Sequence, residues 1–267
     1  MYVYFGHHRC ATLWASNIIM GVCRELDLRY TQEDRYGSVP DQLPAIDFFS
    51  HINADMRIVW QLAGVEFKAF HVIRDPRDIL VSSYFSDRYS HPVYRDEFAG
   101  FRDRLNAVSF DEGLRLELER RTAEFEALAA WNYHDPRIYE TRFERITTDA
   151  RAEFARIFDF MGLPIARRGS QLYAALVRLA AKKALKRVGI RVRTPVLPRP
   201  WLDVIIDRKS FTRLAGRQKG TEDPHSHYRK GVAGDWQNHL AGENKALFKE
   251  RWGQLLIDLG YEQNLDW

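Results

Sequence analysis

The chain opens with a short apolar run that gives way to a helical pattern. Residues 2–5, YVYF, are aromatic or β-branched and predict a buried strand. Gly6 interrupts the run, and from Leu13 to about residue 25 apolar residues recur at helical spacing. A strand, a loop and a helix in this order favour anion binding at the loop, where Arg9 adds a positive charge. An ordinary strand-to-helix turn that happens to contain Arg9 would give the same pattern.

Later apolar runs continue this alternation of strands and helices. Residues 45–52 and 67–73 are expected to form strands, with a helical pattern over 53–63 between them. This is the spacing of a right-handed parallel crossover unit. Further strands are expected at 28–31 and 137–143. The pattern therefore predicts a single α/β domain whose central parallel sheet of about five strands is flanked by helices.

Amphipathic stretches predict three further helices, at 110–131, 149–161 and 243–259. In the first of these, Glu117 and Arg121 are assigned to the side that faces water. Residues 90–101, which include Tyr94, are polar and aromatic and are expected to form a loop over the site.

Composition and charge fit a folded protein that handles anions. The 267 residues allow one large domain or two small ones, and 45% of them are hydrophobic. The net charge is +4 and the sequence pI is about 9.0. Two cysteines, Cys10 and Cys23, imply no disulfide framework and favour a reducing compartment. No apolar run is long enough to span a bilayer, and the first strand leaves no room for a signal peptide, so we expect a cytoplasmic protein.

Two later stretches combine basic residues with helix-capping or turn residues. In residues 71–86, HVIRDPRDILVSSYFS, Asp75 can cap a helix that has Pro76 in its first turn. The next two residues of that helix, Arg77 and Asp78, are expected to form a solvated ion pair. In residues 227–240, HYRKGVAGDWQNHL, a basic pair can meet phosphate oxygens, and the adjoining glycines let the backbone approach closely.

Together with the opening loop, these stretches resemble the sulfotransferases that use 3'-phosphoadenosine-5'-phosphosulfate (PAPS). The family's first loop has the form P-K-S-G-T-T-W, and residues 8–14 here read HRCATLW. Its R-N-P-x-D-x-x-x-S element resembles residues 74–82, and its R-K-G-x-x-G-D-W element is matched at every fixed position by residues 229–236. The resemblance spans residues 2–240 and implies a P-loop-like sulfotransferase fold, with residues 1–267 as one domain.

The resemblance implies transfer of a sulfuryl group from PAPS to a hydroxyl or amine by in-line displacement, which releases adenosine 3',5'-bisphosphate (PAP). His51 ends an expected strand in the place of the family's histidine, which implies that it is the general base. Arg9 stands in the place of the family's lysine and would stabilise charge on the bridging oxygen. No metal is implied. The implied PAPS contacts are Arg9, Cys10, Ala11, Thr12, Leu13, Trp14, Arg74, Ser82, Phe143, Phe211, Tyr228, Arg229, Lys230 and Gly231.

Two other functions stay open at this point. A P-loop kinase or nucleotide hydrolase shares the strand–loop–helix start, but its G-x-x-x-x-G-K-[ST] pattern is missing. A non-catalytic binder of 3'-phosphoadenosine nucleotides is disfavoured by His51, whereas Arg9 in place of lysine keeps it open. The sequence identifies neither the acceptor, a small molecule or a glycan, nor the oligomeric state. We expect no nucleic-acid partner.

The segment from 167 to 193 is helical and strongly basic, and it departs from the compact family pattern. We interpret it as part of an insertion at about 167–200. It could be a plain surface helix, a cover over the acceptor pocket, or an interfacial helix that contacts anionic lipid through residues 170–193.

Overall fold

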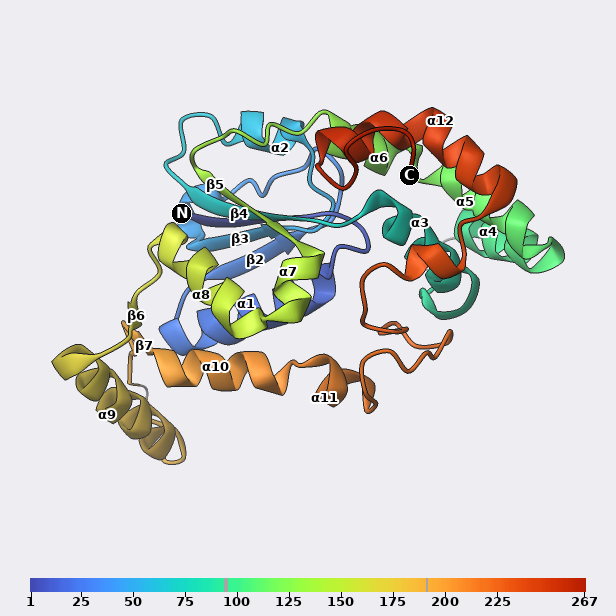
Figure 1. The fold of residues 1–267 in the computed structure, drawn as a ribbon. Helices are drawn as coiled ribbons and strands as arrows, with labels where there is room; N and C mark the ends of the chain where they lie inside the picture. Colours follow the sequence, from blue (N-terminus) through green and yellow to red (C-terminus); the bar gives the residue numbers. More distant parts are fainter. Residues whose placement is uncertain (94–95, 191) are drawn as a thin grey trace.

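The computed structural model describes residues 1–93, 96–190 and 192–267. Tyr94, in the stretch expected to cover the site, and Arg191, in the basic segment, lie outside the described residues. A five-stranded parallel sheet forms the centre of the molecule (Figure 1), in the order β2-β3-β1-β4-β5. Its strands are β1 Tyr2–Gly6, β2 Tyr30–Glu33, β3 Phe48–His51, β4 Lys68–Ile73 and β5 Ile138–Arg142. The predicted α/β class and five-stranded parallel sheet are confirmed.

Strand β1 is the middle strand, and its alternating side chains enter two separate cores. Tyr4 packs in the larger core, whereas Val3 and Phe5 pack in a smaller core on the other face of the sheet. Because helices cover both faces, the central strands are almost entirely buried. This is why they appear in the sequence as continuous apolar runs.

The helices are α1 Thr12–Leu26, α2 Met56–Gln61, α3 Pro76–Phe85, α4 Asp96–Ala107, α5 Phe110–Arg120, α6 Thr122–Ala129, α7 Phe143–Thr148, α8 Ala150–Met161, α9 Gly169–Lys186, α10 Arg199–Arg208, α11 Phe211–Ala215 and α12 Gly242–Asp258. Helices α1, α8 and α10 lie on one face of the sheet and α2 lies on the other (Figure 1). Helix α9 projects from one corner beside a short parallel pair, β6 Ile165–Ala166 and β7 Leu197–Pro198. No described helix combines the length and apolarity needed to cross a membrane.

The single helix expected at 110–131 is wrong, because α5 and α6 are separate helices joined at Arg121. The assignment of Glu117 and Arg121 to the water-facing side is also wrong, since both are buried. The Arg121 guanidinium donates to Glu117 at 2.6 Å, to Glu124 at 2.6 Å and to Asp87 at 2.8 Å. Asp87 comes from a distant segment, and its carboxylate is a partner that the helical pattern could not reveal.

The loop expected at 90–101 is also shorter than predicted, because α4 begins at Asp96. Boundaries of the domain, including the insertion at about 167–200, stay predictions.

The start of α3 confirms one expectation and overturns another. Asp75 caps the helix by accepting from the Arg77 amide at 2.9 Å. Arg77, expected to be solvated, is buried: its guanidinium binds the Asp75 carboxylate at 2.8 Å and Glu262 at 2.5 Å. It also lies over the ring of Trp236, 3.8 Å from the centroid. Partners from the C-terminal part of the chain therefore bury Arg77, although its local sequence pattern is typical of a residue exposed to solvent.

We predict that Arg77→Ala lowers the free energy of unfolding by about 3–5 kcal/mol, because it leaves buried carboxylates unpaired. Arg57→Ala is the matched control. Arg57 makes the same local contact with a capping aspartate, Asp55, but it is largely exposed. We expect no measurable loss there. Urea denaturation measures both variants, and equal losses would contradict the buried role of Arg77.

Candidate active site

A cavity of about 770 Å³ lies where the carboxyl ends of β1, β4 and β5 meet. In open parallel sheets, ligands bind at this edge where the strand order reverses, and here the chain changes direction between β1 and β4. Most residues expected to contact PAPS line this cavity. They are Arg9, Ala11, Thr12, Leu13, Trp14, Arg74, Ser82, Phe143, Phe211, Tyr228, Arg229, Lys230 and Gly231.

The loop between β1 and α1 presents a helix N-terminus to the cavity. Arg9 and Ala11 both have left-handed backbone conformations, with φ of 61° and 60°. Ala11 has no side-chain cap to offer α1, and the first turn of the helix contains no acidic residue. The N–H groups of that turn are therefore available to an anion. Thr12 Oγ1 donates to the carbonyl oxygen of His7 at 2.5 Å and fixes the start of the loop.

Two arginines meet at the back of this loop. The Arg9 side chain donates from Nε to Ser82 Oγ at 3.3 Å, and Arg74 Nη1 donates to the Arg9 carbonyl at 3.1 Å. Burial lowers the pKa of Arg9 to about 10, an effect that the nearby Asp87 carboxylate opposes, so the guanidinium remains charged at neutral pH. Arg74 lies over the Phe143 ring, 4.1 Å from its centroid. Its Nε is buried with no partner among the described residues, which leaves a donor for a ligand.

The basic pair of the last motif, Arg229 and Lys230, faces the same cavity from a loop. Arg229 and Lys230 both bind the carboxylate of Asp235, Lys230 at 2.5 Å. Burial alone would raise the pKa of Asp235, but hydrogen bonds from His239, Lys230 and Arg229 outweigh it and hold that pKa far below its ordinary value. Asp235 therefore stays charged and keeps the two basic side chains in place.

Gly231 is required at its position for two reasons. Its φ is 69°, and a Cβ there would come within 2.4 Å of the Phe211 ring. A larger residue would displace this ring from the cavity wall.

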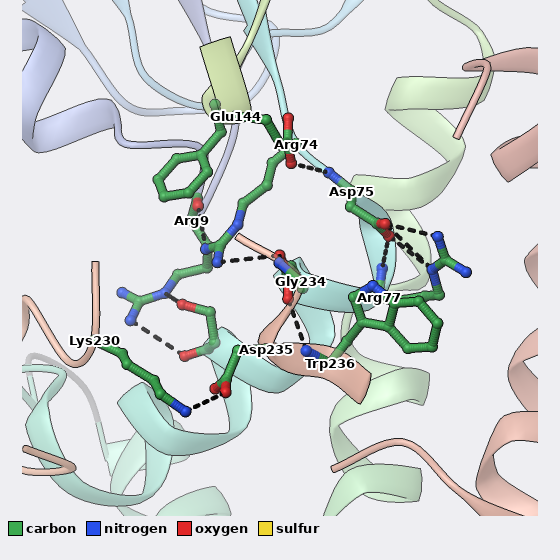
Figure 2. Close-up of polar contacts among 12 residues, drawn as sticks. Arg9, Arg74, Asp75, Arg77, Glu144, Lys230, Gly234, Asp235 and Trp236 are labelled. Atoms are coloured by element: carbon green, nitrogen blue, oxygen red, sulfur yellow. Dashed lines mark hydrogen bonds and ion pairs between the residues drawn. The ribbon is translucent and has the colours of Figure 1, made fainter. Parts of the chain in front are cut away.

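Asp78 joins the two motifs that the sequence presents 156 residues apart. Its buried carboxylate accepts from the backbone N–H of Gly234 at 2.7 Å and of Trp236 at 2.9 Å. It also lies 3.7 Å from the Arg74 guanidinium. The expectation of a solvated Asp78 is therefore wrong: it holds the turn after Lys230 against the start of α3. Figure 2 shows Trp236, from that turn, beside Arg77 of α3.

Three histidines that were not predicted as site residues also line the cavity, namely His8, His91 and His227. Burial lowers the pKa of His8 well below its ordinary value, helped by Arg121 and Arg9, and lowers that of His227 to about 4. Both rings are thus neutral at pH 7. His8 adjoins Arg9 and His227 precedes the R-K-G motif, but only the fold brings them together. No group of three metal-binding side chains occurs within the described part of the chain.

His51 and Cys10, both predicted site residues, do not line the cavity. The Cys10 thiol is buried, and its amide donates to the His7 carbonyl at 3.2 Å. His51 is buried at the end of β3, directly before the lining residues Ile52 and Asn53.

The hydrogen bond made by His51 determines its tautomer. Its Nε2 lies 3.1 Å from the Arg35 carbonyl, which can only accept, so Nε2 carries the hydrogen. Burial lowers the pKa of His51. The ring is therefore neutral at pH 7, with its lone pair on Nδ1, an atom with no partner in the part of the chain described.

Residues 41–191, more than half of the chain, match the family model of the sulfotransferase domain. The chain belongs to the sulfotransferase family. No curated protein matches it in sequence. Among solved structures, mouse sulfotransferase SULT7A1 complexed with PAP has a TM-score of 0.59 and 15% identity, over 96% of this chain and 84% of that one. Retinol dehydratase, solved with PAP and either androsterone or retinol, has a TM-score of 0.54 and 18% identity, over 96% of this chain and 80% of that one. This likeness shows that the sulfotransferase has the fold of these proteins.

Proposed function

We propose that this sulfotransferase moves a sulfuryl group from PAPS to a hydroxyl or amine of a small-molecule acceptor, with PAP as the second product. One observation carries the proposal. Arg9, Arg74 and the pair Arg229 and Lys230 come from three distant segments and converge on one cavity beside an uncapped helix N-terminus. Such a site suits a nucleotide that carries phosphate groups at two positions. The family match disfavours both the P-loop kinase and the non-catalytic binder.

The lining residues divide into groups that suit the parts of the nucleotide. Arg74, Ser82 and Arg229 would bind the 3'-phosphate, and the unpartnered Arg74 Nε is a donor that fits this role. Thr12 and the N–H groups at the start of α1 would bind the 5'-phosphate. The aromatic side chains would hold the adenine. The best placed is Trp14, because its Nε1 donates to the Lys209 carbonyl at 2.6 Å and fixes the ring at the cavity wall.

His51 and Arg9 would supply the chemistry of transfer. PAPS brings an activated sulfuryl group, whose bond to the phosphate oxygen breaks as its bond to the acceptor forms. His51 Nδ1 would take the proton that the acceptor hydroxyl loses. Arg9 would stabilise the negative charge left on the phosphate oxygen, but its guanidinium would not give up a proton. Catalysis would then rest mainly on positioning and charge, as in phosphoryl transfer.

We predict that PAP raises the melting temperature far more than adenosine 5'-phosphate does, because only PAP carries the 3'-phosphate. A ligand at about a hundred times its Kd stabilises a protein by about 2.7 kcal/mol. Arg229→Gln should remove most of the difference between the two nucleotides. Arg251→Gln, at an exposed position, is the charge-matched control and should keep it. Equal shifts from both nucleotides would contradict the assignment of the 3'-phosphate site.

We predict that His51→Ala lowers turnover by about a hundredfold or more and leaves PAP binding nearly unchanged. The assay is a screen of phenols, alcohols and amines with isotope-labelled PAPS, read by mass. Because burial lowers the pKa of His51 from 6.5, wild-type turnover should be constant above pH 6.5 and fall only below it. His134→Ala, at an exposed position, is the control. Wild-type turnover in His51→Ala would exclude it as the base and point to His8 or His227.

A further inference from the structure

The positive charge of the chain is concentrated in one segment. Residues 160–202 contain ten lysines and arginines and no aspartate or glutamate, whereas the whole chain has a net charge of only +4. The rest of the molecule is therefore net negative. Helix α9 lies in the middle of this segment, at a corner of the molecule (Figure 1). None of its residues lines the cavity.

One side of α9 is fixed to the body of the protein. Ala175 and Leu179 are its buried side chains. Lys182 Nζ donates to the carbonyls of Arg24 at 3.2 Å and Glu25 at 2.8 Å, and it pairs with Asp27 at 3.0 Å. A lysine at these carbonyls interacts favourably with the C-terminal end of α1. The helix therefore has a defined orientation, and its opposite side faces away from the core.

That opposite side is apolar instead of charged. Tyr173, Leu176 and Val177 are 72%, 41% and 51% exposed, and spacings of three and four residues place them on one face. Val188 and Ile190, just beyond the helix, are 70% and 52% exposed. A surface helix usually presents polar residues to water, so a second apolar face requires another explanation.

Exposed cations border this apolar face: Lys183 and Arg187 follow Leu176 by seven and eleven residues, and Arg178 lies beyond Val177 on the other border. We propose that α9 docks the protein on the surface of an anionic lipid membrane, with its apolar face in the headgroup region and its cations on the phosphates. An apolar helix face bordered by lysine and arginine is the combination that binds such surfaces. A second copy fits less well, because a two-fold interface would bring two basic segments together. This inference does not depend on the proposed function, since the helix contributes nothing to the cavity.

The charge requirement is tested by co-sedimentation with two kinds of vesicle, one of phosphatidylcholine alone and one with about a quarter phosphatidylserine. We expect the full chain to bind the second kind only. Arg178→Gln with Arg187→Gln should weaken binding about thirtyfold, because each cation near an anionic leaflet contributes substantially. Arg104→Gln with Arg251→Gln makes the same change in net charge at exposed sites elsewhere and should bind like wild type. Equal losses in the two double variants, or equal binding to both vesicles, would overturn the proposal.

The contact face is tested with an environment-sensitive fluorophore on Val177→Cys. Cys10 and Cys23 are both buried, so the introduced thiol is the accessible one. We expect a blue shift on adding anionic vesicles, and none when the fluorophore is on Trp60→Cys, a position that is 66% exposed on α2. A shift at both positions, or none at residue 177, would overturn the proposal. So would a shift at residue 177 that needs no vesicles and grows with protein concentration, which would instead indicate a second copy.

Discussion

The buried carboxylate of Asp78 holds the candidate active site together. It accepts backbone hydrogen bonds from Gly234 and Trp236, while the guanidinium of Arg74, two residues before α3, lies 3.7 Å away. A buried charge is tolerated only when it is well paired, so this carboxylate fixes its partners in one arrangement. The segment it holds has no regular secondary structure before residue 235, so Arg229 and Lys230 depend on that anchor for their positions.

Each cation of the site is balanced by an acid that does not line the cavity. Arg9 lies near Asp87, Arg229 binds Asp235, and Arg74 lies near Asp78. This arrangement lowers the cost of gathering several positive charges, while the side chains stay turned toward the cavity. An incoming anion then meets donors that are already oriented, so less ordering is needed on binding. The acids of the network thus contribute to the site by holding its arginines in place.

The sequence predicted the sheet, and all but one of the residues it assigned to PAPS contacts line the cavity, for a physical reason. Parallel strands buried on both faces must be apolar throughout, and a loop that binds phosphate needs glycine or helix-start geometry next to basic residues. The prediction from sequence failed where partners from distant segments bury a polar side chain. Arg77 and Arg121 both have the local pattern of surface residues, yet Glu262 and Asp87 respectively complete their burial. The convergence of His8 and His227 likewise exists only in the folded chain.

The central claim is that Asp78 organises the proposed phosphate site from a distance. Calorimetric measurement of PAP binding to Asp78→Ala tests it most directly. By charge alone, removing an acid near an anionic ligand should strengthen binding. The structural account predicts the opposite. PAP affinity should fall by at least about tenfold, because two charge-assisted hydrogen bonds that hold the basic loop are lost. Affinity for adenosine 5'-phosphate should change little, since the loop after β1 keeps its contacts. Unchanged or tighter PAP binding would contradict the account.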